Sequence, residues 1–343
     1  MKATYKKRNF LFKIPGGTSR GVLRSKDSWF IILNNDLKTG IGECSIIEGL
    51  SIDNVSEIES KLEWLCLNIN KPQSYLFDEL TDFPSIFFGL EMALRSLKSL
   101  KENILFSSDF TQGKASIPIN GLVWMGEIGF MKKQVDEKIS EGFKCIKLKI
   151  GALDFDTEFT LLKSIRDKYD SSELEIRVDA NGAYHYENAL TILEKLSKLN
   201  IHSIEQPIKA GQTKEMSNLC QNSPIPIALD EELIGVVSIA NKVKLLEEIN
   251  PQYIILKPSL LGGFKSSEEW IKVCPKNTKY WVTSALESNL GLSAISQWVY
   301  SLNNSLPQGL GTGSLFSNNF ESPLCIKNAK LHFNKNNNWN INI

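Results

Sequence analysis

From about residue 116 onward, short apolar runs alternate with amphipathic helical patterns, and this alternation constrains the fold more than any other feature. The runs are rich in β-branched and aromatic residues, whereas the stretches between them repeat apolar residues every three or four positions. Repeated strand–helix units place parallel strands side by side in one sheet. The runs are SIPINGLVW (116–124), CIKLKI (145–150), LEIRVDA (174–180), IHSIEQPI (201–208), PIPIALDEE (224–232), QYIILKP (252–258), YWVTSALE (280–287) and LPQGLGTG (306–313).

Eight such units predict an α/β fold of the (β/α)8-barrel type over residues 116–324, with a missing or distorted final unit. A doubly wound open sheet is the alternative, but no glycine-rich phosphate-binding fingerprint follows any of the runs. Residues 1–115 predict a separate α+β unit, with two strands followed by two amphipathic helices. We expect the tail, 325–343, to return and pair with this unit.

Charge and cysteine usage narrow the class of protein. Lys plus Arg (39) equals Asp plus Glu (39), so the chain lacks the basic excess of nucleic-acid binders. The longest apolar region, 280–302, carries Glu287 and several Ser and Asn residues, which disfavours a membrane span. Six scattered cysteines form no Cys-x-x-Cys pair, and the N-terminus lacks a signal-peptide pattern. We therefore expect reduced thiols and a cytoplasmic location.

Three acids stand at the ends of three successive predicted strands: Asp179, Glu205 and Asp230. They lie 26 and 25 residues apart, one strand–helix unit each. Because the carboxyl ends of barrel strands meet at one rim, and adjacent strands lie about 4.8 Å apart, the three carboxylates can converge. Unneutralised, they would repel one another. The set predicts a divalent cation held by oxygen ligands, Mg²⁺ or Mn²⁺ in its place, rather than zinc.

Three lysines accompany these acids. Lys147 and Lys149 point to the same face of one predicted strand, and Lys257 ends the sixth. Two ammonium groups aimed into an apolar core would be costly, so we expect them to face the carboxylate cluster. A neighbouring metal ion and a second ammonium group would lower a lysine's pKa and suit it to act as a general base.

The pieces KLK, DANG, EQP, DE and LKP, in this order and at barrel spacing, resemble the enolase superfamily and its muconate lactonising enzyme-like subgroup. The resemblance covers nearly the whole chain and implies an enolase-like modified barrel with an N-terminal capping domain. It implies a base that removes a proton α to a carboxylate, on a small-molecule carboxylate substrate. The implied roles are Mg²⁺ ligation by Asp179, Glu205 and Asp230, orientation of these ligands by Asn181 and Glu231, proton abstraction by Lys149, support of Lys149 and the carboxylate by Lys147, and a place on the opposite substrate face for Lys257.

Three further pieces resemble the dehydratases of the subgroup: GGTSRG (16–21), TSALESNLG (283–291) and GLGTGSLF (309–316). The first implies a capping-domain loop that closes over the substrate. In a dehydratase, Lys149 alone would remove the proton and protonate the departing hydroxide on the same face. The residues that would contact the substrate are Thr18, Ser19 and Arg20 of the loop, together with Ser284, Gly309, Gly311 and Thr312.

Other activities remain open from the sequence. N-succinylamino acid racemases and dipeptide epimerases of the same scaffold would use Lys149 and Lys257 as two bases. Dipeptide epimerases carry an Asp-x-Asp where this chain has GTG (311–313), which argues against them. We see no positive feature for muconate-type cycloisomerisation. The three acids argue against a Schiff-base aldolase using Lys257 or Lys149, and a non-catalytic barrel would not need both lysines beside the acids. The sequence leaves monomer and homo-oligomer undecided.

Overall fold

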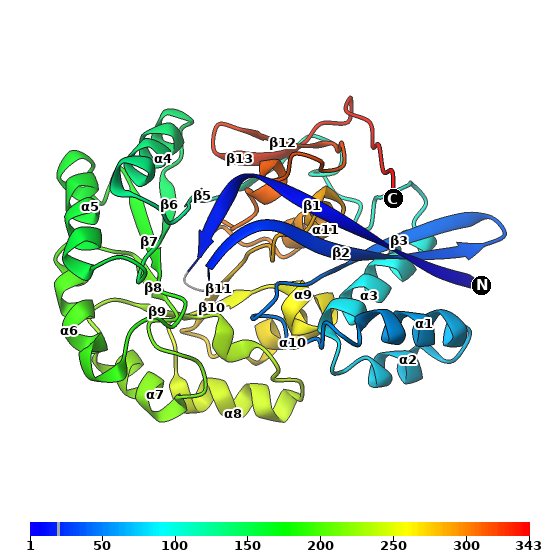
Figure 1. Ribbon diagram of the computed structural model, residues 1–343, viewed down its shortest axis with the longest axis horizontal. Coiled ribbons are helices and arrows are strands. Elements are labelled where there is room, and N and C mark those ends of the chain that lie inside the picture. Colours follow the sequence, from blue (N-terminus) through cyan, green and yellow to red (C-terminus); the bar gives the residue numbers. More distant parts are fainter. Residues whose placement is uncertain (19–20) are drawn as a thin grey trace.

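The computed structural model describes residues 1–18 and 21–343, which form a barrel beside an N-terminal unit (Figure 1). Seven parallel strands follow one another in the barrel sheet in sequence order. They are β5 (Gly121–Val123), β6 (Cys145–Lys149), β7 (Glu175–Asp179), β8 (Ser203–Glu205), β9 (Ile227–Leu229), β10 (Tyr253–Leu256) and β11 (Lys279–Val282). The strands form where the sequence predicted them, because each run is apolar toward the surrounding helices.

The eighth strand is reduced to two residues. Gln308 bridges to Ile119 and Gly309 bridges to Thr283, both in parallel, so the pair lies between the last and first strands and closes the barrel. A side chain at Gly309 would not fit, because its Cβ would lie 2.1 Å from Thr283 Oγ1. The predicted barrel with a distorted final unit is confirmed.

Helices follow every full barrel strand, and only a short 3₁₀ turn follows the eighth (Figure 1). Side-chain caps begin several of them: Asp154 accepts a hydrogen bond from the amide of Thr157, and Ser238 from that of Asn241, both at 3.2 Å. The elements are α4 (Ile128–Ser140), α5 (Phe155–Lys168), α6 (Tyr186–Ser197), α7 (Thr213–Asn222), η1 (Glu231–Leu233), α8 (Ile239–Ile249), α9 (Pro258–Leu261), α10 (Gly263–Val273), α11 (Asn289–Ser301) and η2 (Thr312–Ser314).

The N-terminal unit is an antiparallel sheet packed against helices, which confirms the predicted α+β class, but β3 and α2 add a third strand and a third helix to the two of each that were predicted. Its strands are β1 (Lys2–Thr18), β2 (Gly21–Asn35) and β3 (Lys38–Ser45), and its helices are α1 (Ile58–Asn68), α2 (Gln73–Glu79) and α3 (Pro84–Lys98). Helix α3 lies so close to β3 that a Cβ on Gly42 would approach the Gly89 carbonyl oxygen to 1.8 Å. The long β1–β2 hairpin reaches from this unit toward the barrel strands (Figure 1).

The C-terminal tail contacts both units. Its hairpin, β12 (Leu324–Lys327) and β13 (Lys330–Phe333), pairs with β4 (Ser116–Pro118) at the start of the barrel segment. The chain end instead meets β1, where Lys6 Nζ donates to the Ile343 carbonyl at 2.8 Å. The expectation that the tail's strands pair with the N-terminal unit is therefore wrong, because they pair with β4 of the barrel segment. The proposed boundary at 115/116 stays a prediction.

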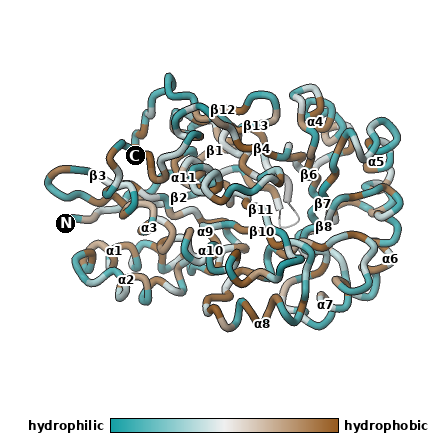
Figure 2. The backbone as a smooth tube through the Cα atoms, turned by 180° about the vertical axis from the view of Figure 1, so that it is seen from behind, coloured by the Kyte–Doolittle hydropathy of each residue, from teal (hydrophilic) through white to brown (hydrophobic). Residues whose placement is uncertain are grey.

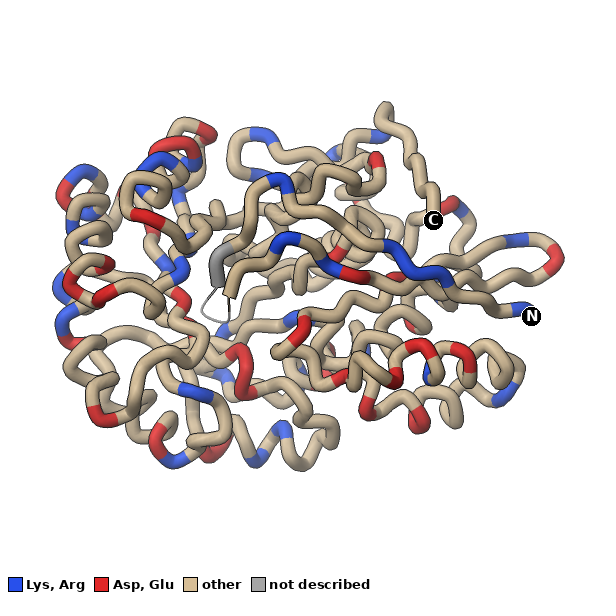
Figure 3. The backbone as a smooth tube through the Cα atoms, in the orientation of Figure 1, with Lys and Arg blue, Asp and Glu red and all other residues tan. Residues whose placement is uncertain are grey.

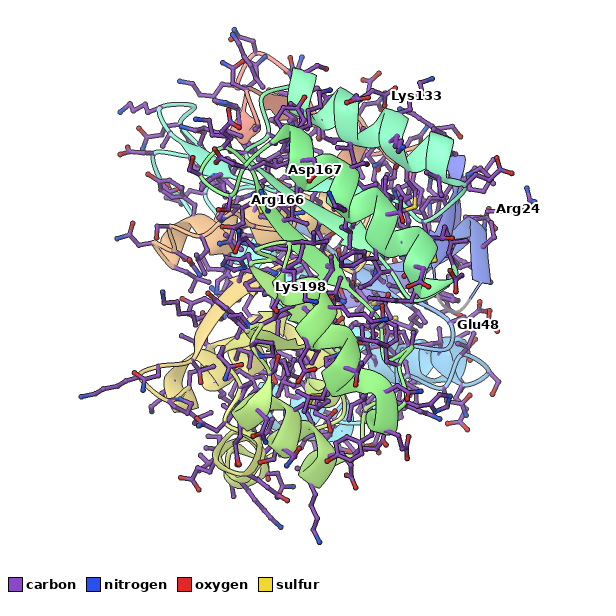
Figure 4. All side chains as sticks on the ribbon, turned by 90° about the vertical axis from the view of Figure 1, so that its left-hand side faces the viewer. Arg24, Glu48, Lys133, Arg166, Asp167 and Lys198 are labelled. Atoms are coloured by element: carbon purple, nitrogen blue, oxygen red, sulfur yellow. The ribbon has the colours of Figure 1, made fainter. Side chains whose placement is uncertain are left out.

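Hydrophilic and charged residues lie on the outer surface of the barrel helices. The outer turns of α5 and α6 are hydrophilic (Figure 2). Acidic and basic positions mix along the outer helices (Figure 3). Figure 4 places Lys133 and Asp167 on these helices, and Arg24 and Glu48 on the side of the N-terminal unit. Within residues 1–18 and 21–343, no helix has the length and apolar character needed to cross a bilayer.

Candidate active site

The predicted acids and lysines meet at the carboxyl-terminal rim of the barrel. Strand register places Lys149 opposite Asp179 and Asp179 opposite Glu205. Asp230 directly follows the next strand, β9. All four side chains start from strand ends that successive helices hold in place, so their common location follows from the parallel register.

Ammonium groups stand between the carboxylates. Lys149 Nζ lies 2.6 Å from Asp179 Oδ2, and Lys147 Nζ lies 2.8 Å from the same atom. Lys147 also contacts Glu205, and Lys257 contacts Asp230. These carboxylates are at most 2% exposed, so the ion pairs are shielded from water.

Asn181 links Lys149, the proposed base, to the carboxyl group of Glu231. Its amide oxygen accepts a hydrogen bond from Lys149 Nζ at 2.7 Å, and its amide nitrogen donates to Glu231 Oε1 at 2.9 Å. Asn181 adopts a left-handed backbone conformation (φ 46°), which asparagine tolerates better than most residues. The structure thus places Asn181 and Glu231 beside the acids and lysines, and the backbone amide of Asn181 donates to Asp179 Oδ1 at 3.0 Å. Their role in orienting the metal ligands stays a prediction.

The mutual charges shift the pKa values of the cluster. Burial raises the pKa of Asp179, but Lys147 and Lys149 outweigh it and hold that pKa far below its usual range. Burial, and then the negative charge of Asp179, raise the pKa of Glu205 well above normal. Burial lowers the pKa of Lys257, yet Asp230 and Glu205 raise it overall. The sequence analysis expected the pKa of such a lysine to be lowered by a metal ion and a second ammonium group. In the structure, the pKa of Lys257 is instead raised by the carboxylates around it.

A cavity of about 340 Å³ opens onto the lysines. Its barrel side contains Lys147, Lys149 and Lys257, and an apolar wall faces them from the N-terminal unit and the loop after β11. Residues from the N-terminal unit are Gly21, Val22, Leu23, Ile47, Glu48 and Leu50; those from the loop after β11 are Thr283, Ser284, Ala285 and Leu286. The cavity therefore suits an anionic ligand with an apolar body.

Those residues predicted to contact the substrate that the structure describes in full all line this cavity. Ser284, Gly309, Gly311 and Thr312 all line it, and the Ser284 and Thr312 hydroxyls share a hydrogen bond of 2.6 Å. Thr18 is the last residue of β1, but its side chain lies outside the described part, as do Ser19 and Arg20 entirely. The loop's predicted contacts therefore stay predictions.

Sequence reasoning missed two polar residues of the site. Asn120 is 4% exposed and lines the cavity, and its Oδ1 has no hydrogen-bond partner among the residues that the structure describes. Gln206, in a left-handed conformation (φ 42°), accepts from the amide of Asp230 and donates to Glu232 at 3.0 Å. Both residues come at the end of an apolar run, in PIN (118–120) and EQP (205–207), and this position could have indicated that they belong to the site.

The carboxylates fit a hard divalent cation by their chemistry, since they offer buried oxygens only. Among the described residues, Lys147 pairs with Glu205 but no group donates a well-directed hydrogen bond to either oxygen of this acid, which leaves lone pairs for another partner. As the side chains stand, no group of three acidic, His or Cys side chains in the described ranges is arranged to ligate one ion. In this arrangement Lys147 pairs with Glu205 and Lys257 with Asp230, so ammonium groups neutralise the carboxylates that would hold the ion.

Lysines on both sides of buried strand-end acids, inside a barrel covered by an α+β unit, are the arrangement of enolase-type enzymes. A family model described as "Enolase C-terminal domain-like" matches residues 131–336. An o-succinylbenzoate synthase of Desulfotalea psychrophila is 46% identical over 363 residues, covering 96% of this chain and 98% of the relative. The chain belongs to the enolase superfamily and, within it, to the o-succinylbenzoate synthase family.

Solved structures agree with this placement. The crystal structure of MenC from Desulfotalea psychrophila LSv54 superposes with a TM-score of 0.86 at 42% identity, covering 97% of this chain and 99% of that one. The o-succinylbenzoate synthase of Thermosynechococcus elongatus BP-1, complexed with Mg in its active site, has a TM-score of 0.75 at 20% identity, covering 90% of this chain and 92% of that one. This second likeness concerns the fold alone.

Proposed function

We propose that the chain is a Mg²⁺-dependent dehydratase that converts 2-succinyl-6-hydroxy-2,4-cyclohexadiene-1-carboxylate into o-succinylbenzoate, a step of menaquinone biosynthesis. The observation that carries the proposal is the cavity lined by both Lys149 and Lys257, which form ion pairs with the buried Asp179 and Asp230 respectively. Membership of the o-succinylbenzoate synthase family supports the same substrate. Free thiols at all six cysteines support a cytoplasmic location.

In this reaction Lys149, as the free amine, removes the proton from the ring carbon that bears the carboxylate. The electron pair of that C–H bond forms the new ring double bond, and the neighbouring C–O bond breaks. The Lys149 ammonium then delivers its proton to the departing hydroxide on the same face, so that water leaves and the amine is restored. One base therefore suffices for syn elimination.

Other residues hold the reactants in place. Asp179, Glu205 and Asp230 would hold Mg²⁺, which supplies positive charge where the substrate carboxylate becomes more negative. Lys147 would help hold that carboxylate, and Lys257 would stay a cation beside the developing aromatic ring. The apolar wall formed by Leu23, Ile47 and Leu286 excludes water from the ring.

The test is an ultraviolet assay for the aromatic product with purified protein, Mg²⁺ and the cyclohexadiene substrate, with and without EDTA. We expect fast turnover that EDTA abolishes and added Mg²⁺ restores. Absence of turnover by folded, Mg²⁺-loaded protein would refute the proposal. Parallel assays with Mn²⁺ compare the two ions as cofactors.

Racemisation of N-succinylamino acids is the second candidate, because Lys149 and Lys257 both face the cavity and can serve as a pair of bases. Loss of the α-proton signal of an N-succinylamino acid in D₂O would reveal this activity by NMR. A rate comparable with dehydration would make the protein bifunctional.

A further inference from the structure

A buried polar cluster joins the N-terminal unit to the loop that forms one wall of the cavity. We call it the interface cluster. Lys26 is 7% exposed, and the other members are completely buried. The N-terminal unit contributes Lys26, Ser28, Glu43 and Ser45, and the barrel contributes Ser259, Glu287 and Ser288. Strand β3 lies beside α11, so the cluster spans the boundary between the two units (Figure 1).

Glu43 is the centre of this cluster. Its carboxylate accepts hydrogen bonds from the Ser288 amide at 2.9 Å, the Ser288 hydroxyl at 2.6 Å and the Gly291 amide at 3.0 Å. It also accepts from the Ser28 hydroxyl at 2.9 Å. A carboxylate from the N-terminal unit thus satisfies amide donors at the start of the barrel helix α11, where negative charge is favourable.

Ala285, three residues before Ser288, is held at both of its backbone polar groups. Its carbonyl accepts a hydrogen bond from the Ser45 hydroxyl at 3.2 Å, and its amide donates to Glu287 Oε2 at 2.8 Å. Ser259, two residues after Lys257, donates to the other oxygen of Glu287. Lys26 Nζ donates to Ser45 Oγ at 2.6 Å, which orients that hydroxyl toward Ala285.

Leu286 lies between these two attachment points and has a strained backbone. Its φ is +59°, in the left-handed region that a leucine adopts only when its surroundings impose it. Leu286 lines the cavity together with Ser284 and Ala285. The hydrogen bonds to Ala285 and Ser288 therefore hold Leu286 in its left-handed backbone conformation, which is unfavourable for an isolated leucine. This conformation determines the shape of the cavity wall.

We propose that Glu43, assisted by Ser45, is a positioning residue: it fixes the strained 284–286 wall and thereby sets the affinity of the cavity for its substrate, without touching the substrate. The N-terminal unit then acts on the active site through the barrel loop, in addition to lining the cavity itself. The choice of substrate in the test rests on the proposed function. The effect on the loop itself does not.

The experiment compares Glu43→Gln with Glu91→Gln, a matched control. Glu91 is also a largely buried carboxyl group of the N-terminal unit, 12% exposed, and it accepts a hydrogen bond from a barrel helix amide, that of Phe264, at 2.6 Å. Glu91 is on α3 and contacts the start of α10, however, and it does not line the cavity. Hydrogen exchange of the 283–291 segment is followed by mass spectrometry, and kcat and KM are measured for the cyclohexadiene substrate.

For Glu43→Gln we expect faster exchange in the 283–291 segment and a KM raised roughly tenfold, with kcat within about threefold of the parent value. For Glu91→Gln we expect both readouts to match the parent. Ser45→Ala removes the hydrogen bond to Ala285 and the one from Lys26 but leaves the contacts of Glu43 in place, so it should raise KM in the same direction by a smaller factor. It keeps the inference testable if Glu43→Gln fails to fold.

The inference is overturned if Glu43→Gln or Ser45→Ala lowers only the melting temperature and leaves segment exchange and KM like those of Glu91→Gln. If the parent protein itself shows no turnover, the proposed function fails, while the exchange comparison still decides whether Glu43 positions the wall. Binding of o-succinylbenzoate, measured by calorimetry, gives a second affinity readout that does not depend on catalysis.

Discussion

Lys149 and Asp179 are direct neighbours in the β6–β7 register, and their Nζ and Oδ2 atoms lie 2.6 Å apart. The contact places the amine at the rim of the cavity while Asn181 holds it from a second direction. A general base must be held this firmly to reach one proton of a bound substrate.

Replacing Lys149 by Ala should reduce dehydration by roughly 10²–10⁴-fold or more, the usual contribution of a positioned acid–base group. The fold should persist, because the lysine is at a strand end. Product absorbance measures the rate and circular dichroism the fold. Lys163→Ala, which removes an exposed lysine paired with Asp167 on α5, is the control and should keep full activity. Appreciable turnover by folded Lys149→Ala would remove Lys149 as the base.

Lys257→Arg should separate dehydration from racemisation. Arginine preserves a cation beside Asp230 but cannot lose its proton near neutral pH. Dehydration, which needs only a cation there, should fall by no more than about tenfold, whereas two-base racemisation should fall by more than about 10²-fold. The two rates are measured on the same preparation with ultraviolet and NMR assays. Equal losses of both activities would show that Lys257 has the same role in each.

Glu205→Gln should weaken Mg²⁺ binding and activity together, because the substitution removes a buried anionic ligand. Loss of one such charge is worth about 3 kcal/mol, or on the order of 10²-fold in affinity. Isothermal titration with Mg²⁺ and the product assay give the two values. Glu187→Gln, at an exposed position of α6, serves as the control. Unchanged Mg²⁺ affinity in Glu205→Gln would exclude Glu205 as a ligand.

The acids and lysines could be found from the sequence because strand alternation fixes which residues end parallel strands, and those ends share one rim. The two-residue eighth strand could not be delimited, since Gln308 and Gly309 bridge their neighbours by backbone groups that any sequence offers. The tail could not be placed either. Leu331 and Phe333 are both buried on β13, but this alternation fits pairing with β4 and with β1 equally well.

Contacts between the two units could not be predicted from the sequence either. Leu23 and Ile47 line a cavity whose barrel residues, from Asn120 onward, lie more than 70 positions further along the chain, and only the docking of the units brings them together. The contacts of Glu43 could not be predicted for the same reason. Its strand is recognisable from local pattern, whereas its contacts with Ser288 and Gly291 join residues about 245 positions apart.

Asn120→Ala should weaken substrate binding. The amide of Asn120 is buried at the cavity with a partnerless oxygen, and a bound ligand that donates to it would relieve a desolvation cost of about 1–3 kcal/mol. We expect KM to rise roughly fivefold to a hundredfold, with a smaller change in kcat. Steady-state kinetics with the cyclohexadiene substrate measure both. An unchanged KM would mean that the substrate does not reach Asn120.

The carboxyl group of Glu91 should make the protein's stability depend on pH. Burial raises the pKa of Glu91 from 4.5 to about 7, and the charged groups that face it are Arg95 and Glu268. Between these two pH values the folded protein keeps the proton and the unfolded chain releases it. The free energy of unfolding therefore falls as pH rises from about 4.5 to about 7, by on the order of 3 kcal/mol, and this contribution is constant above pH 7.

Urea unfolding of the parent and of Glu91→Gln at pH 5, 6, 7 and 8 tests this dependence. The buried carboxyls of Asp53 and Glu287, whose pKa values burial raises to about 6 and about 7, titrate in both proteins and cancel in the difference. The stability of Glu91→Gln relative to the parent should therefore grow from pH 5 to pH 7 and then level off. A difference that stays flat across this range would show that Glu91 is ionised in the folded protein throughout, stabilised by Arg95 and the amide of Phe264.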